Sequence, residues 1–439
     1  YSPCDYTAWS CDPADPEHWR CEGTIYRKNQ DPRNPDGRLS LFAPDVVQGY
    51  DGYYYLYYEL ETVEAVSVAR SRKPAGPYEY YGTVQYPEGV SPDALPDYPY
   101  PFDPGLFRED GHIYMALGFS VDFAIKDMDL NERNMRGAYI VELEKDMLTM
   151  KHVPVFAVPG CGHGKGTSFE GHEYFEAASI RKVDDTYYFI YSSIVMHELC
   201  YATSNNPTEG FTYGGVLVSN CDLHIDTYKP ADMPAAYGAN NHGSMVQIKD
   251  DWYIFYHRQT NGSWYSRQGC AEKLTIAEDG SIAQVEITSC GLNGGPLVGK
   301  GEYPAYLACN LFTDKPSMYV GGEGFPRVMQ DGRDGDEEIG YVGNIQNSAT
   351  AGFKYFDCKG VTEFRLTTRG YADGVFEVKT AWDGEVLATI KIEYTNVWET
   401  YRAPIVIPNG VHAIYLTYKG NGLAALKSFE LVSNHIHRT

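Results

Sequence analysis

FAPDVVQGYDGYYYLYY, which begins at Phe42, is a phrase that the chain repeats three more times. In each copy a polar residue opens an apolar strand, a short turn follows, and an aromatic-rich strand comes next. The other copies are PFDPGLFREDGHIYMAL from Pro101, YFEAASIRKVDDTYYFIYSS from Tyr174 and NNHGSMVQIKDDWYIFYHR from Asn240. Such self-similarity at a long period is typical of a radial or linear array of repeats.

The repeated phrase gives four polar residues equivalent positions, namely Asp45, Asp103, Glu176 and His242. The gaps from these residues to the acidic residue of the following turn are 6, 7, 8 and 8 positions. Because equivalent positions of a repeat array face the same way, we expect the four side chains to converge in space.

Further strands complete each repeat. AVSVARSRKPAGPYEYYG at 65–82 and LCYATSNNPTEGFTYG at 199–214 share a strand, an Ala-x-Ser step, a Pro/Gly turn and an aromatic strand. Helix signals are sparse, so the pattern is all-β. Four strands in about 60–75 residues predict the blades of a propeller, whose first strands line a central channel.

The opening stretch CDYTAWSCDPADPEHWRCEG, residues 4–23, resembles the later half of a blade. Together with four inner strands, it predicts a five-bladed propeller with a truncated first blade. The chain begins with Tyr and has no signal-peptide pattern. We therefore expect the inner strand of that blade, with its axial residue, to lie before Tyr1 or to be supplied elsewhere.

A Gly/Pro-rich passage, GLNGGPLVGKGEYP at 291–304, predicts a domain join. Beyond it, strands such as VFEVKTAW and ATIKIEY alternate without the acidic phrase. We expect the propeller to occupy residues 1–300 and a β-sandwich jelly roll to occupy residues 301–439.

The composition and net charge exclude some classes of binding partner. The 439 residues carry a formal charge of −23, which argues against nucleic acid and anionic membranes and suits a neutral ligand such as a sugar. The ten cysteines form no CxxC pair, so a zinc site is not expected and a reducing compartment is somewhat favoured. We expect a bacterial protein, with a cytoplasmic location slightly favoured over secretion, and leave its oligomeric state open.

Carboxyl groups that face one pocket suit glycosidic cleavage. One carboxylic acid protonates the leaving oxygen, and a carboxylate activates water or attacks. Asp103 and Glu176 fit the supporting and donor roles. The alternative is that these acids only accept hydrogen bonds from backbone donors at strand starts.

Residues 1–290 resemble glycoside hydrolase family 43. The resemblance rests on APDV at 43–46, FDPGLF at 102–107, FEAASIRKVDDTYYFIYSS at 175–193, NHGSMV with FYHR at 241–258, and SRQGCAEKLTIAEDGSI at 266–282. It implies an inverting hydrolase on a five-bladed propeller. Such an enzyme would remove α-L-arabinofuranosyl or β-D-xylosyl residues from plant cell-wall polysaccharides or oligosaccharides.

The resemblance also implies roles for single residues. Glu176 would be the general acid, and Asp103 would orient it and raise its pKa. Asp45 would line the floor of the active site, and Arg267 would contact substrate hydroxyls. His242 would lie where many relatives hold a metal ion, often calcium, through water. No cofactor would be required.

The general base of that family is an aspartate on the first inner strand, and no residue here matches it. Asp5, Asp12 and Asp15 lie on the wrong strands by the repeat register. We expect weak or no activity from this chain alone, and the alternative is a non-catalytic carbohydrate-binding propeller. Fructan-active propellers are disfavoured, because they carry Arg-Asp-Pro and Glu-Cys where this chain has Phe-Asp-Pro at 102–104 and Glu-Ala at 176–177.

Residues from about 305 to 435 resemble a family 6 carbohydrate-binding module. The matching segments are IGYVGNIQNSATAGFKYFD, VFEVKTAWDGEVLATIKI, NVWETYRAPIVIPNGVHAIYLTYKG and LKSFEL. Trp398 matches an aromatic residue that stacks on sugar in relatives. Thr350, Ala425 and Lys427 depart from the binding pattern, which leaves sugar binding and a structural role both open.

Overall fold

The computed structural model describes residues 4–121, 134–315, 325–332 and 340–433. Two compact units emerge, and they interleave along the chain. The first comprises residues 1–217, 240–257 and 274–284, and the second comprises residues 218–239, 258–273 and 285–439. None of the helices in the described ranges is long and apolar enough to cross a lipid bilayer.

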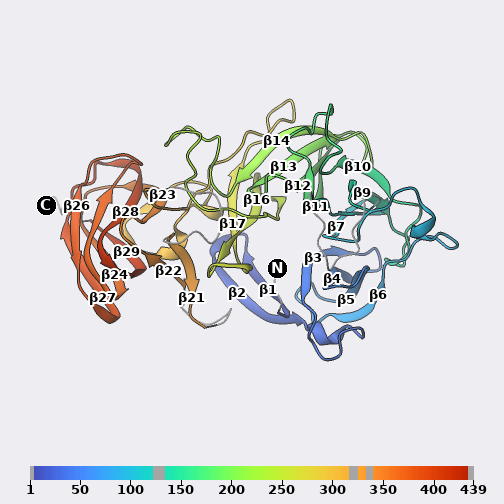
Figure 1. Cartoon of the computed structure of the whole chain (residues 1–439), viewed down its shortest axis with the longest axis horizontal. Helices are drawn as coiled ribbons and strands as arrows, with labels where there is room; N and C mark the ends of the chain where they lie inside the picture. The colour runs from blue at the N-terminus through green and yellow to red at the C-terminus, as the bar shows by residue number, and fades with distance from the viewer. Residues whose placement is uncertain (1–3, 122–133, 316–324, 333–339, 434–439) are drawn as a thin grey trace. The chain divides into compact units, whose positions relative to one another are not determined.

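Three four-stranded antiparallel sheets dominate the first unit (Figure 1). Within each sheet the strands pair in chain order. The sheets are β3 (Leu41–Gln48), β4 (Tyr54–Leu60), β5 (Val66–Ser71) and β6 (Glu79–Thr83); β7 (Gly105–Glu109), β8 (His112–Gly118), β9 (Gly137–Glu142) and β10 (Val155–Pro159); and β11 (Tyr174–Val183), β12 (Thr186–Ser193), β13 (Glu198–Ser204) and β14 (Thr212–Ser219).

Two smaller sheets complete the propeller. One has three strands, β15 (Ser244–Ile248), β16 (Asp251–Thr260) and β17 (Ser263–Leu274), and the other pairs β1 (Tyr6–Asp12) with β2 (Asp15–Tyr26). The predicted all-β propeller is confirmed, and its first blade has two strands among the described residues. The inner strands contact one another in order, β3 with β7, β7 with β11, and β11 with β15.

Tight turns and buried tyrosines explain why these segments form blades. The hairpin between β7 and β8 turns on Asp110 and Gly111, both of which have positive φ, as a type I′ turn requires. The tyrosines pack between blades while their hydroxyls find acceptors: Tyr57 donates to Met147 O at 2.6 Å and Tyr58 to Asp31 Oδ2 at 2.8 Å. The high tyrosine content therefore serves packing at these positions.

The second unit contains a sandwich of two six-stranded sheets, as the sequence predicted. One sheet holds β18 (Leu297–Gly299), β20 (Asn310–Phe312), β23 (Thr350–Cys358), β25 (Ala372–Lys379), β26 (Ala388–Ile392) and β28 (Gly410–Gly422). The other holds β19 (Gly301–Pro304), β21 (Arg327–Gln330), β22 (Gly340–Ile345), β24 (Val361–Gly370), β27 (Thr395–Pro404) and β29 (Ala424–Ser433). Its assignment as a family 6 module stays a prediction.

An ion cluster ties the loop 218–239 to the sandwich within this second unit. Lys354, on β23, is fully buried, and its Nζ lies 3.3 Å from Asp222 Oδ2 and 3.1 Å from Glu286 Oε2. A buried ammonium without such partners would be strongly unfavourable. The loop that leaves the propeller at β14 is therefore anchored by charge as well as by packing.

Gly105 lies where two inner strands come closest. A Cβ built on this residue would overlap the carbonyl oxygen of Ala178 on β11. Only a residue without a side chain permits this approach, so the glycine of the FDPGLF motif is needed by the fold. The same approach brings the starts of β7 and β11 together.

We therefore expect Gly105→Ala to lower the free energy of unfolding by about 1–3 kcal/mol, because the new methyl group overpacks the contact with Ala178. Thermal and denaturant unfolding would measure the change. Gly269→Ala is the matched control, because a Cβ at that exposed strand position meets no atom within 4 Å. Equal stability of the two variants would show that the strands can separate without cost.

Candidate functional site

Irregular backbone marks the start of three inner strands. Ala43 (φ 36°), Asp103 (φ 50°) and Ala177 (φ 70°) adopt left-handed conformations that non-glycine residues rarely use. The pairing register shifts at two of these places, between Phe42 and Asp45 and between Glu176 and Ser179. Such bulges re-aim side chains and are common next to active sites.

Asp103 is the centre of the resulting cluster. Its side chain is 0% exposed, and its Oδ2 accepts a hydrogen bond of 2.9 Å from the backbone N–H of Ala177. His242 approaches the same oxygen, with Nδ1 at 3.8 Å. The backbone N–H of Asp103 donates to Oε1 of Glu59. Asp103 is thus held at both its backbone and its side chain.

Glu176 lies beside this cluster on β11 and is only 3% exposed. Its Oε1 accepts a hydrogen bond of 2.6 Å from Nδ2 of Asn240. The neighbouring Asn241 donates through its backbone N–H to Ser192 Oγ at 3.4 Å, and Ser192 pairs with Glu176 across the β11–β12 hairpin. The segment that leads into β15 therefore fixes the orientation of the Glu176 carboxyl group.

Glu59 was missed by the sequence reasoning. It lies near the end of β4, is 3% exposed, and shares a strand face with the buried Tyr57. Burial, followed by the charge of Asp103, raises the pKa of Glu59 well above its usual value. In the sequence, Glu59 could have been recognised as an acidic residue within a strand that is otherwise aromatic and apolar. Asn240 was also missed, although it opens the last copy of the repeated phrase.

Asp45 takes a different place from the other repeat-equivalent residues. Its Oδ2 accepts from the backbone N–H of Leu106 at 2.7 Å and its Oδ1 from that of Val46 at 2.8 Å. Burial raises the pKa of Asp45, while the charge of Arg181 opposes this shift. Leu106 follows Asp103 by three residues on the neighbouring strand β7. Asp45 therefore lies further along the inner strands than Asp103 does.

Aromatic rings flank the two central acids. Phe102 precedes Asp103 and Phe175 precedes Glu176, and both rings pack against Phe119, at 4.8 Å and 5.4 Å between centroids. Phe102 and Phe175 are half-buried, so part of each ring remains accessible. Such an apolar wall beside buried carboxyl groups suits the face of a sugar ring and limits water around the acids.

Two predicted binding residues belong to the second compact unit. Arg267, on β17, donates through Nε to the carbonyl of Trp264 at 2.8 Å. Trp398, on β27, meets the ring of Tyr341 edge-on at 5.6 Å, and the guanidinium of Arg369 lies 4.3 Å from its centroid. The cation therefore covers one face of the Trp398 ring, which leaves less of the ring for stacking on a sugar.

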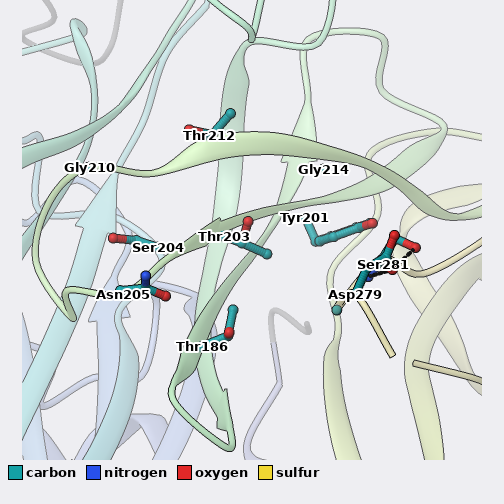
Figure 2. A pocket seen from close by; sticks show the side chains of 11 residues that line it. Thr186, Tyr201, Thr203, Ser204, Asn205, Gly210, Thr212, Gly214, Asp279 and Ser281 are labelled. Carbon is teal, nitrogen blue, oxygen red and sulfur yellow. Dashed lines mark hydrogen bonds between the residues drawn. The ribbon is translucent and has the colours of Figure 1, made fainter. Parts of the chain in front are cut away.

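A polar hollow of about 460 Å³ lies elsewhere in the first unit. Figure 2 shows its lining, which includes Thr186, Thr203, Thr212 and Asp279. Its aromatic residue, Tyr201, is only 2% exposed, so the hollow has hydroxyl groups but no ring face available for stacking. None of Asp103, Glu176 and Glu59 lines it, which separates this hollow from the buried acids.

His172, Glu198 and Cys200 also form a cluster, with potential ligand atoms within 4.8 Å of one another. Glu198 Oε1 already accepts hydrogen bonds of 2.6 Å from His172 Nδ1 and from Ser193 Oγ. These bonds satisfy the carboxylate with protein donors. The cluster is explained as a hydrogen-bond network that braces the β12–β13 hairpin.

A calcium ion at His242 was expected from the resemblance. Calcium takes six to eight oxygen ligands, whereas His242 offers an imidazole whose Nδ1 lies against Asp103. The residues present would fit the ion only if water supplied most of its coordination. The calcium site therefore stays a prediction.

A buried carboxyl group held by one amide, beside a second buried carboxyl group, can donate a proton to a leaving oxygen. The comparisons with known proteins agree with that chemistry. The model of the family described as Glycosyl hydrolases family 43 matches residues 11–282. A protein of Thermoclostridium stercorarium named "Xylosidase/arabinosidase" is 55% identical over 437 residues, covering 98% of this chain and 90% of its own length.

More distant relatives extend the match. A "Xylosidase/arabinosidase" of Bacteroides ovatus is 28% identical over 256 residues, or 54% of this chain and 70% of the relative. A solved β-xylosidase/α-arabinofuranosidase from a compost microbial metagenome, in a calcium-free complex with xylotriose, is 26% identical with a TM-score of 0.50. That match covers 64% of this chain and 83% of the solved one. The chain belongs to glycosyl hydrolases family 43 and is a glycoside hydrolase.

Proposed function

We propose that this chain removes α-L-arabinofuranosyl or β-D-xylosyl residues from plant cell-wall polysaccharides or oligosaccharides, with inversion at the anomeric carbon. The observation that carries the proposal is the buried group in which Asn240 holds Glu176 while Ala177 and Glu59 hold Asp103. The 55% identical relative is named for xylose and arabinose, which supports this choice of sugars.

In this proposal Glu176 is the general acid. Its carboxyl group gives a proton to the glycosidic oxygen as the bond to the sugar breaks. Asp103 orients Glu176 through the backbone of Ala177, which donates to Asp103 Oδ2 and is the next residue after Glu176. A second carboxylate must activate the attacking water in an inverting reaction. We assign no described residue to that base.

A non-catalytic sugar-binding propeller is the less favoured candidate. Its supporting feature is that no residue of the chain matches the expected base. Against it, the chain retains a buried, hydrogen-bonded Glu176, whose role as an acid would have no use in binding alone. Family membership and the high identity to a protein named as a glycosidase favour hydrolysis.

The cellular location, a calcium ion and the role of the sandwich complete the proposal. The ten cysteines, which all lie in the described ranges, form no disulfide bond, and this supports a reducing compartment and a cytoplasmic location. A calcium ion near His242 would act structurally through water. The sandwich either binds polysaccharide or has a structural role, and the cation over Trp398 favours the second role.

A panel of aryl glycosides tests the function directly. We expect aryl α-L-arabinofuranoside or aryl β-D-xyloside to be hydrolysed and aryl β-D-glucoside to remain intact. Turnover of the hydrolysed substrates should be weak, because no described residue takes the role of the general base. Proton NMR of the first product would show inversion. Binding of xylo-oligosaccharides without any hydrolysis would favour the non-catalytic candidate.

Glu176→Gln tests the acid. Natural oligosaccharides have poor leaving groups that need protonation, so their turnover should fall by at least about a hundredfold. Aryl substrates with activated leaving groups should lose much less. Undiminished turnover of a natural oligosaccharide would remove Glu176 from the acid role.

Asn240→Leu removes the donor that holds Glu176 and keeps a side chain of similar size. A hydrogen bond to a charged or reacting carboxyl group contributes about 1.5–3 kcal/mol, so we expect kcat to fall about tenfold to a hundredfold. Asn205→Leu, in the separate polar hollow, serves as the control. Equal rates for both variants would show that Asn240 does not position the acid.

A further inference from the structure

We infer that Glu59 is a positioning residue, a neutral carboxyl group that holds the backbone of Asp103 in the geometry that the active site requires. The inference rests on the proposed function, because it assigns Asp103 to the reaction. It concerns a residue outside the repeated polar positions and outside every role that the family resemblance supplied.

Glu59 contacts the backbone of Asp103 directly. Oε1 of Glu59 accepts the backbone N–H of Asp103, a residue 44 positions away in the chain. Asp103 is fully buried and has a φ of 50°, a conformation that costs free energy in a residue with a side chain. A buried N–H without an acceptor would cost about 1–3 kcal/mol more. Glu59 therefore stabilises a conformation that Asp103 would not otherwise keep.

The carboxyl group of Glu59 is surrounded by buried polar side chains. The titratable groups near Glu59 are Tyr6 of β1, Tyr174 and Glu176 of β11, and Asp103. His242 lies next to this group, against Oδ2 of Asp103. Tyr6 donates its hydroxyl hydrogen to Phe42 O at 2.8 Å, and Tyr174 donates to Gly118 O at 2.9 Å. Both phenols are thus engaged with backbone acceptors rather than with Glu59.

The second oxygen of the Glu59 carboxyl group makes no hydrogen bond with the described residues that would stabilise a negative charge. Within the described part of the chain, Oε2 of Glu59 is buried and has no hydrogen-bond partner. A carboxylate in this place would bury an uncompensated charge next to two further acids. A protonated group avoids that penalty, and its carbonyl oxygen still accepts the N–H of Asp103.

Neutrality also separates the role of Glu59 from that of Asp103. A neutral Glu59 adds no charge to the pair formed by Asp103 and Glu176. It acts as a rigid acceptor, which a glutamine could replace. An ionised Glu59 would instead act on Glu176 through its charge, and a glutamine could not replace it.

Two variants separate these possibilities. Glu59→Gln keeps an acceptor without a titrating group, and we expect kcat within about twofold of the unmodified chain and an unchanged pH profile of kcat/KM. Glu59→Met has a similar volume but no comparable acceptor. We expect its kcat to fall at least about fivefold with KM little changed, since an orphaned buried N–H costs about 1–3 kcal/mol.

Three outcomes would overturn the inference. They are a Glu59→Met variant with unchanged kcat, a Glu59→Gln variant as impaired as Glu59→Met, and a shifted pH profile in Glu59→Gln. The last two would mean that Glu59 acts through its charge. Thermal unfolding of each variant shows whether it is folded, and the Gln variant remains informative if the Met variant does not fold.

Hydrogen exchange supplies a measurement that needs no turnover. In the full chain, the peptide that contains Asp103 should exchange faster in Glu59→Met and at the unmodified rate in Glu59→Gln. If the aryl glycosides remain intact while this exchange pattern appears, the proposed function fails and the positioning of Asp103 stands. Equal exchange in all three proteins would overturn the positioning role.

The pH dependence of stability supplies the second independent measurement. The pKa of Glu59 is raised by folding above its reference value of 4.5, so the folded chain binds this proton more tightly than the unfolded chain. The stability that the proton contributes is complete below about pH 4.5 and is lost as the pH rises toward the folded pKa. Glu59→Gln should remove this loss, and an identical pH dependence in both proteins would contradict a neutral Glu59.

Discussion

Close contact between the inner strands β3, β7 and β11 is the constraint on which the rest of the site depends. Gly105 permits that contact, because its missing side chain leaves room for the carbonyl of Ala178. The approach brings together acids that are far apart in the sequence, at positions 59, 103 and 176. With wider spacing, the hydrogen bond from Ala177 to Asp103 could not form, and Glu176 would lose its link to Asp103.

The same closeness explains the irregular backbone. Left-handed residues at Ala43, Asp103 and Ala177 each cost about 1–3 kcal/mol, which a regular strand would avoid. Bulges here turn acids toward their partners at the price of strain. The hydrogen bonds that Asn240 donates to Glu176 and that Glu59 accepts from Asp103 offset that strain, so the catalytic group is rigid before substrate arrives.

Repetition explains which parts of this structure could be predicted from the sequence. The polar residue, turn and aromatic strand recur, so the propeller and the approach of Asp103 to His242 and to the β11 segment that carries Glu176 follow from one register. Asp45 shows the limit of that register, because a bulge of the β3–β4 pairing separates it from Phe42 and its carboxyl contacts Leu106. Glu59 lies outside the repeated polar positions, and its partner is a backbone N–H that leaves no sequence signal.

The electrostatics of the cluster favour a protonated Glu59. Two unit charges 4 Å apart repel by about 4 kcal/mol at an effective dielectric constant of 20, and a third charge would repel both. Neutral backbone and amide groups donate hydrogen bonds to Glu59, Asp103 and Glu176, and His242 Nδ1 lies 3.8 Å from Asp103 Oδ2. Holding a proton on Glu59 removes two repulsions without removing the acceptor that Asp103 requires. A neutral Glu59 therefore holds Asp103 without adding a third charge beside Glu176, the group that gives its proton to the leaving oxygen.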